Sequence, residues 1–351
     1  MKKCQKAAMQ LKFFAYLCGQ IEKRTMVTVR NKTLWGCLAV VLWALVVVQC
    51  RHGGSAVGNS ASALSQEEMR IAASQHIDST WVQTWTKDSV TVSLIPCNDG
   101  DSVKRLLSGL TAEAWMLVEE SSGLLISAKN AHQRRPPASL TKMMTCMLAL
   151  ERGTMGDTVE ITDDVFLAKN SRARLGDRFL LGNIIREMTL LSDNDAANAV
   201  AKQVGGNIAA FCQLMNEKAA TLGMDSTHFA NPNGMPGDST YSTARDLLVL
   251  ARYCMRDSTF AKIVGTDSMD IPMADGRHLP CKNTNMLIES YEGCKGVKTG
   301  YTRSAGYCLA STATRRGTTL FLVLLGSESL PARFEESVLL LDYGFRVMDI
   351  Q

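Results

Sequence analysis

Apolar residues follow one another almost without interruption from residue 138 to residue 150, directly after prolines at 136 and 137. Proline cannot continue a helix but is tolerated in its first turn, so a helix should begin here. A helix that is apolar around its whole circumference belongs in a protein interior. Ser139 and Lys142 nevertheless stand near its start, one turn apart on the same face. The pattern therefore predicts a central helix that carries a hydroxyl and an amine at its N-terminal end.

Strand-like apolar runs lie on both sides of this helix, and segments with helical periodicity lie mostly between them. The predicted fold class is α/β (α+β): an antiparallel sheet built from N- and C-terminal strands, flanked by helices and with an inserted helical lobe. We predict strands at 114–119 and 123–129 (a hairpin) and at 296–299, 306–314 and 318–326, and helices at 183–191, 195–203, 208–222, 243–255 and 335–347.

The N-terminal region has a different pattern, in which basic residues precede an apolar run. Residues 1–33 contain eight Lys and Arg and one acid, a net charge of +7, and residues 34–48 are apolar throughout. This layout is typical of a secretory signal or a signal anchor, with its basic end in the cytoplasm. We assign residues 1–50 to this segment and residues 51–65, rich in Gly, Ser and Ala, to a flexible tether.

Three fates are open for this segment: signal cleavage near 61–63, lipoprotein-type cleavage before Cys50, or retention as a membrane anchor. Met26 is an alternative start that would shorten the basic flank. In every case we expect export, with the folded domain in the periplasm or on the extracytoplasmic face of the membrane. Residues 66–112 form an unassigned lead-in with possible short strands at 81–85 and 90–95, and residues 113–351 form the main domain.

The composition of the chain limits the classes of function that the protein can have. The chain is 46% hydrophobic and 21% charged, values of an ordinary globular protein. Its net charge of +4 comes from residues 1–33, which leaves −3 for the rest, so no nucleic-acid-binding surface is expected. None of the 11 cysteines has the spacing of a zinc site, and we predict no metal and no cofactor. Cys281 and Cys294 are candidates for a disulfide in an oxidising compartment.

The pair Ser139 and Lys142 suits nucleophilic chemistry. Free backbone N–H groups and the positive end of the helix dipole lie beside a serine at a helix N-terminus, and they favour a developing oxyanion. A desolvated lysine near another cation has a lowered pKa and can take the serine proton. Taken alone, however, Ser-x-x-Lys is usually a helix cap followed by a solvated lysine.

Two further motifs follow in the order that this chemistry needs. Ser192-Asp193-Asn194 precedes an Ala-rich helix, and Lys298-Thr299-Gly300 ends a strand-like segment. The first is also a typical helix N-cap, and the second is also an ordinary charged strand end before a turn. The joint occurrence of the three motifs, each on the expected kind of element, favours a catalytic interpretation.

As a set, these motifs resemble the low-molecular-mass penicillin-binding proteins that act as serine-type D-alanyl-D-alanine carboxypeptidases, with a DD-peptidase/β-lactamase-like fold. The resemblance covers about residues 112–348. It rests on Pro137 to Lys142, Ser192 to Ala197, Met215-Asn216, Leu222 to Met224, Tyr241 to Asp246, Gly296 to Thr302 and Ala305 to Tyr307.

The resemblance implies a role for each site residue. Ser139 would be the acylated nucleophile and Lys142 its general base, while Ser192 would relay a proton and Asn194 would hold the substrate amide or Lys142. Lys298 would be a second cation that lowers the pKa of Lys142 and attracts the substrate carboxylate. Substrate binding would also involve Thr299, Gly300, Tyr301 (whose N–H, with that of Ser139, would form an oxyanion hole) and Arg333.

The implied substrate is a peptidoglycan stem peptide that ends in D-Ala-D-Ala, and the implied inhibitors are β-lactams. Alternatives are a DD-endopeptidase of peptidoglycan cross-links, a serine β-lactamase and a non-catalytic penicillin or muropeptide sensor. A class A β-lactamase needs a glutamate for deacylation, and residues 228–243 contain none. The presence of Ser139, Lys142 and Lys298 together argues against the sensor.

Overall fold

A five-stranded antiparallel sheet forms the centre of the fold in the computed structural model, which describes residues 107–348 apart from residues 170 and 238. The strand order is β2-β1-β9-β8-β7, so N-terminal strands pair with C-terminal ones, as predicted. The strands are β1 (Ala114–Glu119), β2 (Leu125–Lys129), β7 (Cys294–Thr302), β8 (Gly306–Arg315) and β9 (Thr318–Ser327).

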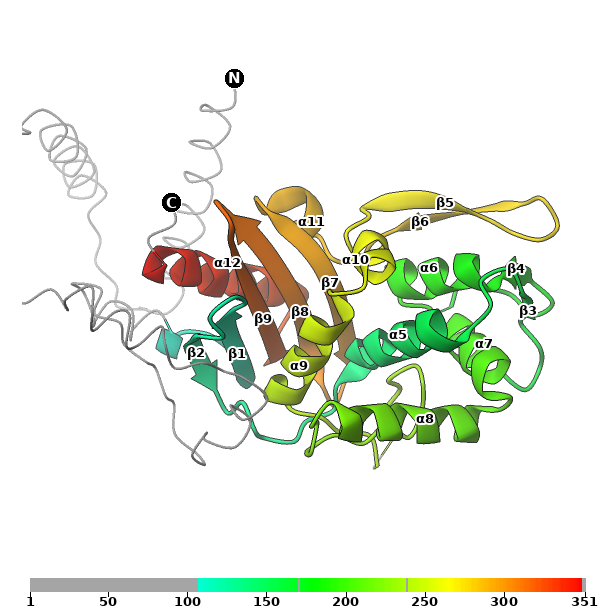
Figure 1. Cartoon of the computed structure of the whole chain (residues 1–351), viewed down its shortest axis with the longest axis horizontal. Helices are drawn as coiled ribbons and strands as arrows, with labels where there is room; N and C mark the ends of the chain where they lie inside the picture. Colours follow the sequence, from blue (N-terminus) through cyan, green and yellow to red (C-terminus); the bar gives the residue numbers. More distant parts are fainter. Residues whose placement is uncertain (1–106, 170, 238, 349–351) are drawn as a thin grey trace, which may run out of the picture. The chain divides into compact units, whose positions relative to one another are not determined.

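Helices cover both faces of this sheet (Figure 1). The helix α12 packs on one face and α9 on the other, and α5 to α8 extend beyond α9 as the predicted helical lobe. The helical elements are the short 3₁₀ helix η2 (Ala138–Thr141), α5 (Lys142–Arg152), α6 (Leu181–Leu191), α7 (Asn194–Gly205), α8 (Ile208–Thr221), α9 (Ala244–Cys254), α10 (Ser258–Val264), α11 (Leu287–Ser290) and α12 (Leu330–Val347).

The alternation of side chains along β9 explains why both faces are covered. Leu320, Leu322 and Leu324 belong to the hydrophobic cluster under α12, whereas Phe321 and Val323 belong to the cluster under the helical lobe. Successive strand residues point to opposite faces, so an uninterrupted apolar strand buries both of its faces. This strand therefore lies in the interior of the sheet, between β1 and β8.

The helix α5 lies at the centre of the lobe, as its sequence predicts. Every residue from Lys142 to Ala149 is buried, and the helix packs against α6, α7, α8, α9 and α10. Its start differs slightly from the prediction, because residues 138–141 form the 3₁₀ turn η2 before the α-helix begins. Ser139 therefore stands on a tight turn at the helix entrance.

Two small hairpins were not predicted. One pairs β3 (Thr158–Glu160) with β4 (Arg178–Leu180), and the other pairs β5 (Ser268–Pro272) with β6 (His278–Lys282). In each of these strands only one side chain is buried. A strand with so few apolar positions gives no clear period-two pattern, so its sequence resembles a loop.

The folded part begins before residue 113. Leu107, Leu110 and Ala112 are buried in the cluster under α12, so the boundary predicted at 112/113 is too late. The other predictions for this end of the chain, namely segments 1–50 and 51–65 and the possible strands at 81–85 and 90–95, lie outside the described residues.

The candidate disulfide between Cys281 and Cys294 does not form in the structure. Both thiols are free, as are those of Cys146, Cys212, Cys254 and Cys308. Cys281 lies in the small β5–β6 sheet, whereas Cys294 begins β7 of the main sheet and its Sγ is 3.4 Å from the Gly296 carbonyl oxygen. The short sequence separation of the two cysteines therefore does not make them partners.

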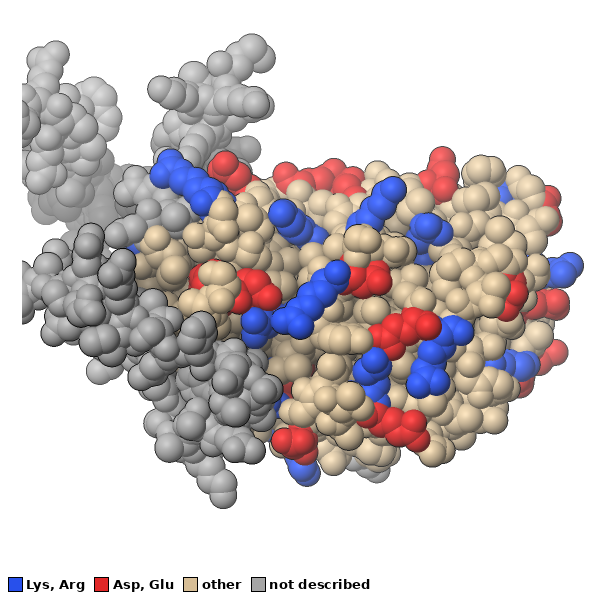
Figure 2. Space-filling model, in the orientation of Figure 1, with Lys and Arg blue, Asp and Glu red and all other residues tan. Residues whose placement is uncertain are grey.

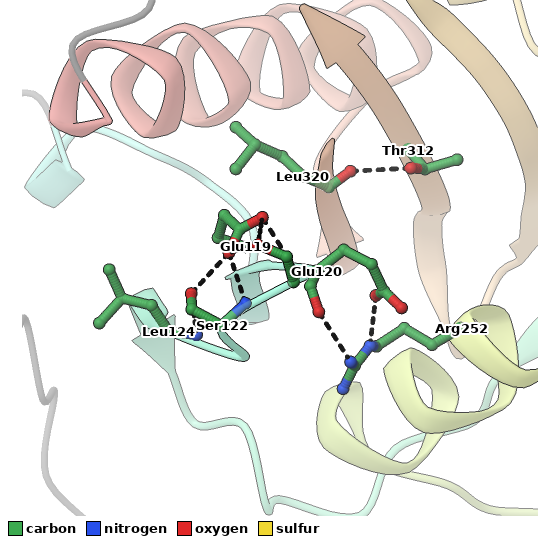
Figure 3. A network of polar contacts seen from close by, with 8 residues as sticks. Glu119, Glu120, Ser122, Leu124, Arg252, Thr312 and Leu320 are labelled. Atoms are coloured by element: carbon green, nitrogen blue, oxygen red, sulfur yellow. Dashed lines mark hydrogen bonds and ion pairs between the residues drawn. The ribbon is translucent and has the colours of Figure 1, made fainter. Parts of the chain in front are cut away.

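Polar contacts hold the β1–β2 turn and connect it to α9 (Figure 3). The Glu119 carboxylate accepts hydrogen bonds from Ser121 and Ser122, and the Arg252 Nε lies 2.6 Å from a Glu120 carboxylate oxygen. On the face shown in Figure 2, basic and acidic side chains are interspersed. Among the described residues, no helix is both long and apolar enough to span a bilayer.

Candidate active site

The three predicted motifs meet at one cleft. Ser139 comes from η2, Ser192 from the junction of α6 and α7, and Thr299 and Gly300 from β7; all four residues line a cavity of about 780 Å³. β7 is an edge strand of the sheet and packs against η2. Segments that lie more than 150 residues apart in the sequence thus face one another across the nucleophile.

Lys142 is the centre of the polar contacts in this cleft. Its Nζ lies 3.1 Å from Ser139 Oγ, 2.8 Å from Asn194 Oδ1 and 2.6 Å from the Asn233 carbonyl oxygen. The side chain is 1% exposed. Three acceptors match the three donors of an ammonium group. Loss of the proton leaves a neutral amine within reach of the serine hydroxyl, which is the geometry that a general base requires.

Two glycines allow the backbone to approach the nucleophile closely. A Cβ on Gly234, whose φ is +82°, would lie 1.9 Å from the Ala138 carbonyl oxygen. A Cβ on Gly300 would lie 3.0 Å from the Ser139 backbone nitrogen. Any larger residue at 234 would displace η2, and one at 300 would press on the amide beside the reactive hydroxyl. Gly300 therefore has a steric role in the predicted site.

The Ser192-Asp193-Asn194 motif combines a cap with a catalytic turn. Ser192 has a left-handed conformation, with φ 63° and ψ 32°, and ends α6. Asp193 begins α7 as its N-cap and accepts from the backbone N–H groups of Asp195 and Ala196. Asn194, the first residue of α7, turns its Oδ1 to Lys142 and donates from Nδ2 to the Lys169 carbonyl oxygen at 2.9 Å. The helix-cap prediction is therefore confirmed, and the same motif also brings Asn194 into contact with Lys142.

The Lys298-Thr299-Gly300 motif lies on β7 on the opposite wall. Lys298 is 2% exposed, and its Nζ donates to the Thr299 carbonyl oxygen at 3.1 Å. The Thr299 hydroxyl pairs with that of Thr284 at 2.6 Å. Thr284 also lines the cleft, although sequence reasoning did not identify it.

Arg333 and Tyr301 lie on the same side of the cleft. Arg333, from α12, is 4% exposed and donates from Nη1 to the Gly300 carbonyl oxygen at 3.3 Å, while its Nε has no hydrogen-bond partner in the part of the chain that the structure describes. Tyr301 is half exposed and stacks on Tyr307 with ring centroids 4.2 Å apart. Burial lowers the pKa of Arg333 to about 10. The structure thus brings together every residue predicted for the site.

Burial sets the basicity of Lys142. It lowers the pKa of Lys142 to about 7, although Asp193 and Glu187 nearby act in the opposite direction. The ammonium form loses hydration in the interior, and this favours the neutral amine. A substantial fraction of Lys142 is therefore neutral at physiological pH.

The expected division of charge between the two lysines requires a correction. We expected Lys298 to stay charged and to lower the pKa of Lys142. Instead, burial, followed by the charges of Lys142 and Arg333, lowers the pKa of Lys298 well below its usual range. Lys142 has three acceptors and Lys298 has one, so the proton favours Lys142 when the cleft holds no anion.

Sequence reasoning missed three contributors to this site. The carbonyl of Asn233 holds Lys142, the hydroxyl of Thr284 holds Thr299, and the carboxylate of Asp193 accepts from Ser171 Oγ at 2.6 Å as well as from its own helix. A backbone carbonyl carries no side-chain signature, and a single threonine has no distinctive spacing. Only Asp193 had a visible signal, its place inside the second motif.

Comparison with known proteins gives a consistent family. A model of the D-alanyl-D-alanine carboxypeptidase family matches residues 101–329. The D-alanyl-D-alanine carboxypeptidase DacB2 of Mycobacterium tuberculosis is 32% identical over 67% of this chain and 82% of its own length. The crystal structure of the Streptomyces K15 DD-transpeptidase is 32% identical, with a TM-score of 0.63, over 68% of this chain and 98% of that one.

Coverage differs among these relatives. The D-alanyl-D-alanine carboxypeptidase DacF of Bacillus subtilis is 32% identical over 67% of this chain, but the match spans only 62% of that protein. Residues 101–329, which the family model matches, contain the three motifs.

Proposed function

The chain belongs to the D-alanyl-D-alanine carboxypeptidase family, and from this premise we propose that it removes the terminal D-alanine from peptidoglycan stem peptides through an acyl-serine intermediate. The observation that carries the proposal is the contact of 3.1 Å between Lys142 Nζ and Ser139 Oγ, at a cleft whose lining includes Ser139, Thr299 and Arg333, with buried Lys298 directly before Thr299 in β7. The same groups would accept a β-lactam as an acylating inhibitor.

In the acylation step, the neutral amine of Lys142 takes the proton of Ser139 while Oγ attacks the carbonyl carbon of the penultimate D-alanine. The tetrahedral intermediate collapses as the C–N bond to the terminal D-alanine breaks. Ser192 donates its hydroxyl proton to the leaving amine and recovers a proton from the Lys142 ammonium, which returns Lys142 to the neutral amine. The backbone N–H groups of Ser139 and Tyr301 are proposed to hold the oxyanion. Water then attacks the ester, and Ser139 recovers its proton.

The terminal carboxylate of the substrate would bind near Lys298, Thr299 and Arg333. An anion at this place raises the pKa of Lys298, because an opposite charge favours the ammonium form. A charged Lys298 in turn lowers the pKa of Lys142, since coupling between two titrating groups is mutual. Substrate binding therefore favours transfer of charge from Lys142 to Lys298 and prepares the base for reaction.

Two other reactions share this acyl-enzyme. A DD-endopeptidase would release a longer amine from a cross-link, and the buried Arg333 beside the cleft favours a free carboxylate instead. A DD-transpeptidase would pass the acyl group to an amine rather than to water, and the likeness to the Streptomyces K15 enzyme supports this second candidate. For a class A β-lactamase a deacylating glutamate at the cleft is required, and none of the described residues that line the cleft is a glutamate.

We place the folded domain outside the cytoplasm as part of the same proposal. Its support is the basic segment 1–33 followed by the apolar run 34–48. A reporter fused after residue 65 should be active only on the extracytoplasmic side of the membrane. Activity confined to the cytoplasm would contradict export.

The deciding experiment combines labelling with product analysis. A labelled penicillin should attach to Ser139, and Ser139→Ala should remove the label while leaving the circular dichroism spectrum unchanged. Mass analysis after incubation with a pentapeptide stem, a cross-linked dimer and an added amine acceptor should show release of D-alanine from the first. Cleavage of the dimer would favour the endopeptidase, and a product joined to the acceptor the transpeptidase. Label on another residue would contradict the proposal.

A further inference from the structure

Glu187 is a buried carboxyl group that the proposed reaction does not use. It lies on α6, five residues before Ser192, and its side chain is fully buried. Within the described residues, neither of its carboxylate oxygens receives a hydrogen bond. It does not line the cleft. A carboxylate in such a place would lack both water and donors, and this costs several kcal/mol.

The groups that surround Glu187 come from three neighbouring elements. The elements α7, α5 and β6 pack against α6, and they carry Asp193 and Asp195, Lys142 and Cys281, whose charges interact with that of Glu187. The side chain of Asp193 is within hydrogen-bonding reach of Glu187. Burial and then Asp193 raise the pKa of Glu187 well above its usual range, and Lys142 opposes this only in part.

Two carboxyl groups in contact cannot both be ionised at low cost, so they share a proton. The contacts of Asp193 show which group holds it. Asp193 accepts hydrogen bonds from Ser171 Oγ and from the backbone N–H groups of Arg172, Ala173, Asp195 and Ala196. Five donors stabilise the ionised form of Asp193, whereas Glu187 has no donor among residues 107–348 as described. The proton therefore belongs to Glu187.

We propose that Glu187 is a positioning residue, which as the un-ionised acid donates a hydrogen bond to Asp193 and so holds the catalytic turn and the adjacent cleft wall in place. Asp193 stands between Ser192 and Asn194, the groups that act on the leaving amine and on Lys142. The same carboxylate also holds Ser171 and Arg172, which line the cleft. Through Asp193, the hydrogen bond from Glu187 thus stabilises both the turn of Ser192 and Asn194 and the part of the cleft wall formed by Ser171 and Arg172.

The neutral state of Glu187 also affects the pKa of Lys142, the proposed general base. A negative charge at this place would favour the ammonium form of Lys142 and raise its pKa, which would leave less of the reactive amine at neutral pH. An un-ionised acid supplies the hydrogen bond to Asp193 without that charge. Glutamine has nearly the same shape and can donate the same hydrogen bond from its amide, whereas methionine has similar volume and no donor.

The first arm of the test does not depend on activity. An infrared difference spectrum of the folded protein against Glu187→Gln at pH 7 should contain the carbonyl stretch of an un-ionised carboxylic acid. A matched difference spectrum for Glu336→Gln should lack it, because the buried Glu336 is surrounded by donors. Absence of the band from the Glu187 spectrum, or its presence in both, would overturn the assignment of the proton.

The second arm measures penicillin acylation against pH and rests on the proposed function. Glu187→Met should slow acylation about 10-fold or more, the usual worth of a hydrogen bond to a charged group. Glu187→Gln should restore most of that loss and leave the acid limb where it is in the unmodified protein. The control Glu336→Gln should change neither the rate nor the limb of the folded fraction.

Two kinetic results would overturn the positioning role. If Glu187 were ionised, Glu187→Gln would remove a negative charge and move the limb to lower pH. If Glu187→Met matched the unmodified rate, the hydrogen bond would not position the site. Failure of penicillin to label Ser139 at all would contradict the proposed function instead, and the infrared arm would still decide the state of Glu187.

Discussion

Two buried glutamates, Glu336 in α12 and Glu187 in α6, lie in opposite kinds of surroundings. Glu336 accepts hydrogen bonds from the backbone and hydroxyl of Thr111, from the Ala112 N–H and from Ser327 Oγ. It thereby joins the start of the described chain to the end of β9 and to α12. Glu187 has no donor within the described residues. Hydrogen bonds from the fold stabilise the carboxylate of Glu336, whereas Glu187 must keep its proton to remain buried.

Other charged groups of the molecule show the same contrast between surroundings that supply partners and surroundings that do not. At the β1–β2 turn, burial raises the pKa of Glu119, but hydrogen bonds from Ser122 and Ser121 outweigh it and lower the pKa overall (Figure 3). In the cleft, Lys142, Lys298 and Arg333 are all buried, and none of them has an ion pair with a described residue. Perturbed groups of this kind gather where a protein binds or transforms an anion.

The difference teaches that burial of a charge has two uses in this molecule. Where donors or counter-charges are complete, as around Glu336, they offset the cost of burial and tie segments of the fold together. Around the buried cations Lys142, Lys298 and Arg333 no described carboxylate forms an ion pair, and a substrate carboxylate would supply the missing negative charge. Substitutions in the first region should therefore change the free energy of unfolding, and substitutions in the second should change the rate of acylation.

The largest effect on rate is expected for Lys142→Met. Loss of a general base should slow penicillin acylation by about 10²–10⁴-fold. Asn194 and Asn233 lose a donor, but the cost of burying an amine disappears as well, so the free energy of unfolding should change less than for a substitution of Glu336. The measurement pairs acylation rates with urea unfolding. A variant with normal acylation would remove Lys142 from the mechanism.

The largest effect on stability is expected for Glu336→Ala. Its donors at Thr111, Ala112 and Ser327 would be left without an acceptor, and a buried unpaired group costs about 1–3 kcal/mol. We expect the free energy of unfolding to fall by about 3 kcal/mol, with unchanged acylation by the folded fraction. Urea unfolding and active-site titration would measure the two quantities. A loss of acylation by the folded fraction, together with the loss of stability, would show that the surroundings of Glu336 and the cleft are not independent.

A smaller effect should appear in the pH dependence of stability. The folded pKa of Lys142 is about 7 against 10.5 for an ordinary lysine, so between these values the unfolded state binds more protons. Stability should therefore rise with pH across this window, by at most about 1.4 kcal/mol per pH unit for one lysine. Below about pH 7 the slope from this group should vanish.

The matched variant for this slope is Lys142→Met, which should remove the share of one lysine and leave the share of Lys298, whose pKa is also lowered by burial. Glu336→Ala should leave the slope unchanged, because Glu336 lies outside the cleft. Thermal or urea unfolding measured from pH 6 to pH 10 would provide the comparison. Stability that falls with pH in the unmodified protein, and equally in Lys142→Met, would contradict the lowered pKa of Lys142.

The smallest effect is expected for Thr284→Val. This change removes the hydroxyl that pairs with Thr299 Oγ1 at 2.6 Å and preserves the shape of the side chain. Loss of one hydrogen bond should raise KM for a pentapeptide stem by about 2- to 10-fold with little change in kcat. An unchanged KM would show that Thr284 does not orient Thr299 for the substrate.

Much of this fold could be predicted because its main elements have strong periodic patterns. The sheet strands and the helices α5 to α9 were expected within a few residues of their bounds. The hairpins β3–β4 and β5–β6 were missed because their strands bury too few side chains. The α12 helix was predicted to begin at 335 but begins at Leu330, since Ser329 caps it and Pro331 occupies its first turn.

The sequence by itself predicted which residues meet in the candidate site. Ser139, Lys142, Asn194, Lys298 and Arg333 were all expected in the site, since a nucleophile, a base and an anion-binding cation carry side-chain signatures in fixed motifs. The same was true of the central place of α5, because an apolar helix must be buried.

Only the tertiary structure decided how these groups share protons and contacts. The Asn233 carbonyl, Thr284 and Glu187 come from segments with no motif, and the preference of the proton for Lys142 over Lys298 depends on how many acceptors each lysine meets. A pKa depends on burial and on neighbours that are distant in sequence. The chain order specifies which residues can react, but the packing of η2, α6, α7 and β7 around one cleft sets the charge each of them carries.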